Sequence, residues 1–503
     1  MESQDIDPKL PADEPLIINK KLSLLEALIP LFALIAMLAY NVYVYGDEAT
    51  GGSNQFILLL GGAIAAIVGF RNRVGYEAML EEIAKNVKST TGAILILLMV
   101  GALSGTWLIS GIIPTMIYYG LQVLHPSIFL PACVVICSII SVATGSSWTT
   151  SATVGIALIG IGATIGMPLG MVAGAVISGA YFGDKLSPLS DTTNLAPAMA
   201  GSDLFTHIRY MLYTTVPTMI LTLIIFVFLG LSQTTTGTPN DTEILSAIQA
   251  TFNVSPWLFV VPALVIIMIV KKTDPLVALL AGTLLGGIFA LIFQPELVAK
   301  IGGSAQLDFI SGYKGVMNAI TVETNIETTS AVLNDLFSSK GMIGMMGTIW
   351  LIICAMVFGG VMEAIGALTR ITDALLKTFN TVFGLFASTV ASCLALNLTA
   401  SDQYLAIVVP GKMFSKAYAD KNLAPENLSR TLEDAGTVTS VLVPWNTCGA
   451  YQAGVLGVST FSYLPYALFN IISPFMTLLF AAFHIKIKQL NDSAPSSTKT
   501  IVK

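Results

Sequence analysis

Long apolar runs separated by short polar stretches dominate this chain. The first half has apolar runs at residues 24–45, 54–70, 92–124, 127–143, 151–167 and 208–232. The second half has them at residues 256–270, 275–294, 342–365, 382–398, 402–418 and 463–485. About 20 apolar residues in a helix are enough to cross a bilayer. The pattern predicts an all-α polytopic membrane protein with about 10 full spans plus two shorter re-entrant hairpins.

The composition supports this assignment. Of the 503 residues, 54% are hydrophobic and only 11% are charged, whereas soluble proteins carry about 25% charged residues. No basic patch indicates a nucleic-acid partner, so the expected partners are the lipid bilayer and small solutes. The five cysteines include no CxxC pair, and we expect no cofactor. The oligomeric state is left open, a homodimer included.

Basic residues set the expected orientation. Lys20 and Lys21 precede the first span, and Lys486 and Lys488 follow the last one. Loops on the cytoplasmic side of a membrane are rich in basic residues. We therefore expect a multi-pass protein of the cell (inner) membrane with both termini in the cytoplasm. The polar stretch 295–340 is then external. We expect a cytoplasmic acidic tail at residues 1–20 and repeat 1 at residues 21–232. An external linker at residues 233–255 joins it to repeat 2 at residues 256–488, and residues 489–503 form a cytoplasmic tail.

The two halves repeat each other with opposite orientation. Thr144 begins TGSS and Thr399 begins TASD, 255 residues later. Two further pairs, Pro188 with Pro444 and Cys137 with Cys393, are 256 residues apart. One half starts inside and the other starts outside. Inverted repeats with broken helices and a site near the midplane are typical of secondary transporters.

Each half is expected to contain one re-entrant hairpin and one broken helix. In the segment 402–418, Lys412 and Lys416 would lie in hydrocarbon if the segment crossed completely. From Asp402 to Lys412 is about 15 Å of helix, roughly half a bilayer. We therefore place Asp402 near the midplane at a hairpin tip, with TGSS at the tip of the matching hairpin. The broken helices contain GDKLSPLSDTT and VLVPWNTCG.

Polar residues at these tips and breaks are the candidate ion and proton site. Unwound backbone together with carboxylate and hydroxyl oxygens suits a hard cation. The candidates from repeat 1 are Asp184, Asp191, Ser146, Ser147, Ser190, Thr192 and Asn194. Those from repeat 2 are Asp402, Thr399, Ser401, Asn446 and Thr447. Ser147 aligns with Asp402 and Asp191 with Thr447, so each repeat contributes one carboxylate that the other lacks. We expect Asp191 and Asp402 to hold Na⁺.

For three other acidic residues and for Asp184, the sequence leaves the role open. Glu363, Glu433 and Asp434 could provide a proton route, although an ion pair with Arg430 is preferred for the last two. Asp184 could instead pair with its neighbour Lys185 as a structural latch. We expect the aromatic residues near the tips to pack against the cavity wall, namely Trp148, Trp445 and Tyr404.

Several motifs together resemble the NhaC family of Na⁺/H⁺ antiporters. They are GTWLISGIIPTMIYYG, TGSSWTTSATVG, GDKLSPLSDTTNLAP, FGGVMEAIGAL and LVPWNTCGAYQ, and the resemblance runs from about residue 20 to 485. It implies export of Na⁺ driven by entry of protons, with Na⁺ as the transported ion. Relatives in the same family exchange malate and lactate or carry amino acids.

Two alternatives remain to be weighed. An organic-anion or amino-acid transporter would need fixed positive charge in the core, where Lys185 and Arg430 are the few basic residues. An intramembrane protease would use the Gly183-Asp184 pair, but the chain has no partner aspartate in a matching motif. The sequence therefore favours a cation/proton exchanger and not an enzyme.

Overall fold

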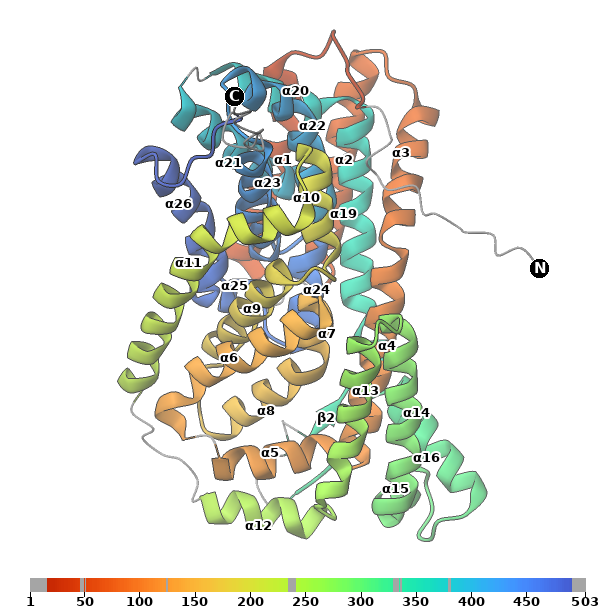
Figure 1. Cartoon of the computed structure of the whole chain (residues 1–503). Coiled ribbons are helices and arrows are strands. Elements are labelled where there is room, and N and C mark those ends of the chain that lie inside the picture. Colours follow the sequence, from red (N-terminus) through yellow and green to blue (C-terminus); the bar gives the residue numbers. More distant parts are fainter. Residues whose placement is uncertain are drawn as a thin grey trace, which may run out of the picture.

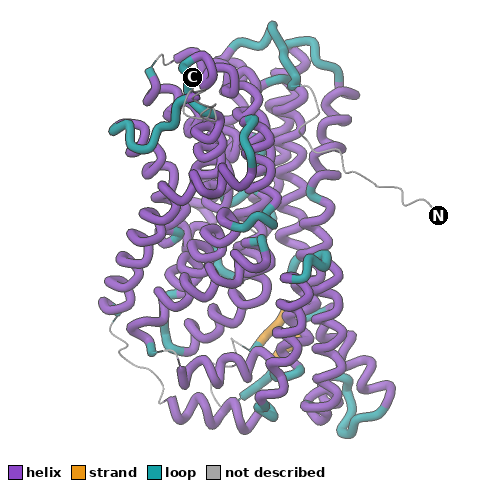
Figure 2. The backbone as a smooth tube through the Cα atoms, in the orientation of Figure 1, coloured by secondary structure: helices purple, strands orange, loops and turns teal. Residues whose placement is uncertain are grey.

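The computed structural model describes residues 16–45, 49, 51–123, 125–233, 241–328, 334, 337–378 and 381–490. The described part is almost entirely helical (Figure 2). Its only paired strands are β1 (Thr324–Asn325) and β2 (Ser338–Ser339), a two-residue antiparallel ladder in the stretch expected outside. The all-α prediction is confirmed apart from this ladder. The tails 1–15 and 491–503 lie outside the described residues.

The elements follow the apolar runs closely. Repeat 1 contains α1 (Leu24–Tyr45), α2 (Ser53–Arg71), α3 (Tyr76–Ser89), α4 (Thr91–Ile109), α5 (Ile112–Val123), α6 (Pro126–Thr144), α7 (Ser147–Thr150), the π-helical turn η3 (Ser151–Gly155), α8 (Ile156–Thr164), α9 (Leu169–Leu186), α10 (Asp191–Ala200) and α11 (Leu204–Ser232). The linker contains α12 (Asp241–Thr251).

Repeat 2 has a corresponding hairpin and broken helix, together with additional short elements. It contains η4 (Pro256–Phe259), α13 (Val260–Val270), α14 (Pro275–Phe293), α15 (Pro295–Ile301), α16 (Phe309–Thr321), α18 (Gly341–Gly344), α19 (Met346–Ala364), α20 (Ala367–Thr378), α21 (Val382–Thr399), α22 (Gln403–Asp420), α23 (Pro425–Leu432), η5 (Glu433–Thr437), η6 (Ser440–Leu442), α24 (Thr447–Leu456), α25 (Thr460–Tyr463), η7 (Leu464–Tyr466) and α26 (Leu468–Ala482).

The number of spans agrees with the prediction. Among the described residues, eight helices are long and apolar enough to cross a membrane. Two bent pairs raise the number to as many as ten. One pair joins Ile244–Thr251 to Pro256–Val270 at 85°, and the other joins Thr460–Tyr466 to Leu468–Ala482 at 52°. These ten include α6 and α21, the long arms of the two hairpins, and leave out the broken helices α9–α10 and α23–α24. Counting the two broken helices in place of the two hairpin arms again gives about 10 spans, as expected.

Both predicted hairpins are present. The hairpin formed by α6, α7, η3 and α8 lies in the lower half of Figure 1, and the hairpin formed by α21 and α22 lies in the upper half. Their tips approach the middle of the molecule from opposite ends. The broken helices α9–α10 and α23–α24 also have their breaks in the middle (Figure 1).

The backbone itself carries the inverted repeat. Left-handed glycines occur at Gly111 and Gly366, 255 residues apart, and at Gly201 and Gly457, 256 residues apart. The first pair follows α4 and α19, and the second ends α10 and α24. Glycine adopts the left-handed backbone conformation at little energetic cost, so glycine is favoured where a helix must end sharply.

One detail of the sequence alignment changes at the hairpin tips. The N-cap of α7 is Ser146 and the N-cap of α22 is Asp402, which lie 256 residues apart. Ser146, rather than Ser147, is therefore the structural equivalent of Asp402. The difference arises because α6 has 19 residues and α21 has 18. Aligning Thr144 with Thr399, the last residues of these helices, therefore places the following residues one position out of register.

Close backbone packing fixes the first hairpin to the first broken helix. An added Cβ at Gly179 would lie 2.2 Å from the carbonyl oxygen of Val134, and one at Gly183 would lie 2.5 Å from that of Ser138. The Ser141 hydroxyl donates to the Ala180 carbonyl at 2.6 Å. Small residues four apart let membrane helices approach closely. α6 and α9 therefore pack as one rigid unit that carries the tip and the break together.

Candidate functional site

Four helices begin at the centre of the molecule. Their N-caps are Ser146 for α7, Ser190 for α10, Asp402 for α22 and Asn446 for α24. Each cap side chain accepts a hydrogen bond from a backbone N–H in the first turn of its helix. Helix N-termini carry partial positive charge, so the centre combines positive helix ends with polar and acidic side chains.

The tip of the first hairpin touches the first helix break. Gly145 has a φ of 71°, and a Cβ there would lie 2.5 Å from the Cβ of Leu189. Only glycine combines this left-handed backbone with so close an approach. In repeat 2 the corresponding contact is a hydrogen bond, since the Thr447 N–H donates to the Ser401 carbonyl at 2.9 Å.

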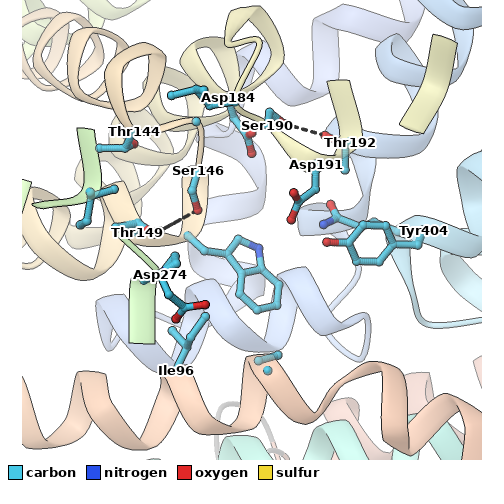
Figure 3. A pocket seen from close by; sticks show the side chains of 18 of the residues that line it. Ile96, Thr144, Ser146, Thr149, Asp184, Ser190, Asp191, Thr192, Asp274 and Tyr404 are labelled. Atoms are coloured by element: carbon cyan, nitrogen blue, oxygen red, sulfur yellow. Dashed lines mark hydrogen bonds between the residues drawn. The ribbon is translucent and has the colours of Figure 1, made fainter. Parts of the chain in front are cut away.

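A cavity of about 690 Å³ lies between these helix ends. Figure 3 shows polar side chains from both repeats facing it. Seven of the predicted site residues line it, namely Asp184, Asp191, Asp402, Ser146, Ser190, Thr192 and Thr447. The two main predicted carboxylates, Asp191 and Asp402, therefore line one cavity although they come from separate repeats.

Asp184 ties the first hairpin to the first broken helix. It is 9% exposed, and its Oδ2 accepts from the backbone N–H and the hydroxyl of Ser147 at 3.1 and 2.7 Å. Because Ser147 is the first residue of α7, the carboxylate also faces a positive helix end. The expected latch between Asp184 and Lys185 is wrong, because neighbouring residues on a helix point in different directions and Lys185 bonds elsewhere.

Asp402 and Asp191 present their carboxylates in different ways. Asp402 is 6% exposed, and its Oδ1 accepts from the N–H groups of Tyr404 and Leu405 at 2.6 and 3.2 Å. Asp191 is the first residue of α10 and is exposed on the cavity side. Figure 3 shows its carboxylate beside the hydroxyl end of Tyr404. Asp191 is thus the more accessible acid and Asp402 the more rigidly held one.

The other predicted residues support the backbone around the cavity. Asn194 donates to the carbonyls of Pro188 and Ser190 at 3.0 and 2.7 Å, which spans the first break. Asn446 donates to the backbone and side-chain oxygens of Asn397, both at 3.2 Å. Thr399 bonds to its own helix at the Ala395 carbonyl. Ser401 adopts a φ of 60° in the second tip, where its carbonyl accepts from Thr447.

Asp434 and Glu363 lie away from the cavity. The fully buried carboxylate of Asp434 forms an ion pair with Lys185, not with Arg430 as expected. It also accepts from the hydroxyls of Thr214, Ser473 and Thr477. Glu363 sits in the last turn of α19, where the amide of Asn86 on α3 lies 3.3 Å from its carboxylate.

The sequence reasoning missed one contribution to the cavity. The basic pair Lys271 and Lys272 in the turn between α13 and α14 predicts a cytoplasmic position for this turn. In the structure Lys272, Thr273 and Asp274 line the cavity. Figure 1 shows this turn near the middle of the molecule. Asp274 is the N-cap of α14, accepting from the Leu276 N–H at 2.8 Å. Helix capping alone explains an aspartate at this position in the sequence, so nothing in the sequence indicated that Asp274 lies beside the cavity.

Two of the three aromatic residues expected at the cavity wall lie there. Trp148 and Tyr404 line the cavity, and the Trp148 ring stacks on Tyr451 with centroids 4.0 Å apart. Trp445 instead donates to the Leu398 carbonyl at 2.9 Å. Among the described residues, no group of three or more His, Cys, Asp or Glu side chains is arranged to hold a metal ion.

Inverted repeats, paired hairpins and broken helices around a polar central cavity define a secondary transporter. The comparisons with known proteins identify which kind. The chain belongs to the Na⁺/H⁺ antiporter family, whose model matches residues 179–485. This membership confirms the resemblance noted in the sequence.

Three relatives illustrate the range of the family. The Na⁺/H⁺ antiporter NhaC of Alkalihalophilus pseudofirmus is 39% identical over 84% of this chain and 89% of its own length. The malate-2H⁺/Na⁺-lactate antiporter of Bacillus subtilis is 38% identical over 85% of this chain and 88% of its own. The arginine/ornithine antiporter ArcD of Halobacterium salinarum is 33% identical over 99% and 98%. These relatives are antiporters, so the chain is a transporter and not an enzyme.

Proposed function

We propose that the protein exchanges cytoplasmic Na⁺ for external H⁺ by alternating access, with Asp191 and Asp402 binding Na⁺ and H⁺ competitively. The observation that carries the proposal is that these two carboxylates, one from each repeat, line a single cavity where four helices begin. Asp184 supports the same site through its hydrogen bonds to Ser147.

Competition follows from simple electrostatics. A carboxylate held out of water is costly to leave charged, and either a proton or a Na⁺ ion neutralises it. Hard cations prefer oxygen ligands, which Ser190, Thr192 and Thr447 supply beside the carboxylates. If only a neutralised site can change its exposure from one side to the other, each Na⁺ carried outwards is replaced by protons carried inwards.

The proposed orientation places both termini in the cytoplasm of a multi-pass inner-membrane protein. Asn19 packs against Gly366 between α19 and α20, and Lys488 binds Glu426 at the start of α23. Basic residues near these ends favour the cytoplasmic side. The repeat boundaries 21–232 and 256–488 belong to the same proposal.

A second candidate is a transporter of a small organic solute. The cavity volume of about 690 Å³ fits such a solute as well as hydrated Na⁺. An organic anion would meet Asp184, Asp191, Asp402 and Asp274, against the single cation Lys272 in the lining. This charge balance disfavours malate or lactate. Uptake of labelled malate, lactate and arginine into proteoliposomes discriminates between the candidates.

The direct test measures proton flux in proteoliposomes after addition of Na⁺. The wild type should release protons, and Asp191→Asn and Asp402→Asn should each abolish the release while the protein stays monodisperse. Asp373→Asn, in a surface ion-pair cluster on α20, is the matched control. Full exchange in either cavity variant contradicts the proposed site.

The apparent Na⁺ affinity provides an independent test. If one proton competes with Na⁺, the affinity should weaken by up to about tenfold for each pH unit of acidification. The dependence is measured from initial rates at a series of Na⁺ concentrations between pH 6 and 9. An affinity independent of pH would show that protons and Na⁺ do not share the site.

A further inference from the structure

A row of four polar side chains, three of them charged, runs along α23 and into η5, outside the central cavity. Glu426, Arg430, Glu433 and Thr437 follow one another at spacings of four, three and four residues. Residues spaced this way share one face of a helix. All four are at most 5% exposed. We call this set the α23 row; it lies inside the protein from the start of α23 to the π-helical turn η5.

Two members of the row have charges without protein partners. Neither carboxylate oxygen of Glu433 has a hydrogen-bond partner among the described residues, and the same holds for all three guanidinium nitrogens of Arg430. Arg430 instead lies over the Tyr210 ring, 4.6 Å from its centroid. Glu433 and Arg430 form no ion pair within 4.0 Å in the described structure. Both side chains are fully buried.

Such groups require small polar partners. Leaving a carboxylate or a guanidinium buried and unpaired is strongly unfavourable, and buried water commonly satisfies polar groups of this kind. Glu433 also begins η5, and π-helical turns occur frequently at functional sites. The row therefore has the properties of a hydrated path rather than those of a packed core.

Titratable groups surround Glu433 on several elements. On its own helix these are Arg430 and Asp434. Asp184 and Lys185 on the neighbouring helix α9 interact with Glu433. His207 on α11 lies near Lys185 and Asp434, and Tyr418 on α22 lies near Arg430 and Cys393. Nε2 of His207 is buried without a hydrogen-bond partner in the described structure, while its Nδ1 lies 2.7 Å from the Ser429 hydroxyl.

The row runs from beside the central cavity to one end of the molecule. At the inner end, Glu433 lies close enough to the cavity residue Asp184 for their charges to interact, and its neighbour Asp434 pairs with Lys185. At the outer end, Glu426 binds the Lys488 ammonium at 2.7 Å, and its second oxygen is buried without a partner in the described part. The proposed orientation places this outer end in the cytoplasm.

We propose that Glu433 relays the exchanged proton between the central carboxylates and the cytoplasm, along a path separate from the Na⁺ route through the cavity. This inference rests on the proposed function. The proton passes from Asp191 or Asp402 to the carboxylate of Asp184 in the same cavity. The Glu433 carboxylate accepts it from Asp184 through hydrogen-bonded water and passes it on through water along the row to Glu426. Only O–H bonds form and break, and Arg430 balances the charge of Glu433 once its proton has left.

The test separates proton transfer from Na⁺ transport in proteoliposomes. Glu433→Gln keeps the size of the side chain but cannot carry the proton. We expect its Na⁺-driven proton flux to fall at least tenfold, while ²²Na⁺/Na⁺ exchange at equal pH on both sides stays within twofold of the wild type. Glu433→Asp should recover much of the proton flux, because it restores a carboxyl group.

Glu426→Gln provides a second variant near the protein surface. It should slow proton flux severalfold and leave ²²Na⁺/Na⁺ exchange unchanged, whether or not Glu433→Gln folds. Undiminished proton flux in either variant, or an equal loss of both activities in the folded protein, overturns the relay. A wild type without Na⁺-driven proton flux would overturn the proposed function itself, so the two failures are distinguishable.

Discussion

The buried pair of Lys185 and Asp434 predicts an unequal response to removal of its two charges. Lys185→Met leaves the Asp434 carboxylate with three hydroxyl donors, from Thr214, Ser473 and Thr477. Asp434→Leu leaves the Lys185 ammonium with the Ser473 hydroxyl at 3.4 Å as its one remaining hydrogen-bond contact among the described residues. The lysine is therefore left far less satisfied than the aspartate would be.

The structure sets the expected size of the effect. Removing one partner of a buried ion pair costs about 3–5 kcal/mol, and a hydrogen bond to a charged group contributes about 1.5–3 kcal/mol. We place Lys185→Met near the lower limit, because three hydroxyls remain, and Asp434→Leu near the upper limit. The double variant removes both charges and should cost less than either single change, since apolar replacement of a buried pair is often nearly neutral.

Thermal stability in detergent provides the measurement. The fraction of protein that stays monodisperse after heating gives an apparent Tm for each variant. The expected order from most to least stable is wild type, double variant, Lys185→Met and Asp434→Leu. Additive effects in the double variant, or a milder effect of Asp434→Leu than of Lys185→Met, would refute the reasoning.

Three further predictions concern packing, the first hairpin tip and topology. Gly183→Ala should sharply reduce the yield of folded protein, because the new methyl group would lie 2.5 Å from the Ser138 carbonyl oxygen; Gly92→Ala, whose methyl group meets nothing within 4 Å, is the control. Ser147→Ala removes the 2.7 Å hydrogen bond to Asp184 and should weaken apparent Na⁺ affinity by roughly tenfold, about 1.4 kcal/mol; unchanged affinity would show that the tip contact is dispensable. Single cysteines at positions 412, 416 and 421 should be labelled from the cytoplasmic side and those in 295–340 from outside; external labelling at 412 contradicts the proposed hairpin orientation.

The sequence predicted the architecture well because the relevant signals are local or periodic. Apolar length determines which helices can span, and polar breaks inside apolar runs mark where they stop. The constant offset between Pro188 and Pro444 reflects a backbone that repeats, which the glycines at 201 and 457 confirm. The position of Asp402 at a hairpin tip was predictable because the helical rise per residue converts its distance in sequence from Lys412 into a depth in the membrane.

Partner choice across the molecule was not predictable in the same way. Lys185 and Asp434 are 249 residues apart, and no local pattern indicates that they pair. The position of Asp274 beside the cavity depends on how α14 packs against α4 and on how α13 packs against α14. Its sequence context, an aspartate before Pro275, is fully explained by helix capping.

The convergence of four helix starts has a consequence for how this fold could change its cargo. The carboxylates of Asp402, Asp191 and Asp184 occupy or face the starts of α22, α10 and α7, where a negatively charged solute would otherwise bind. Replacing them by hydroxyl or amide side chains would leave the same backbone with uncovered positive ends pointing into the same chamber. A cation exchanger and an anion exchanger can therefore differ by a few substitutions at fixed architecture, so that divergence of cargo within such a lineage requires no remodelling of the helices.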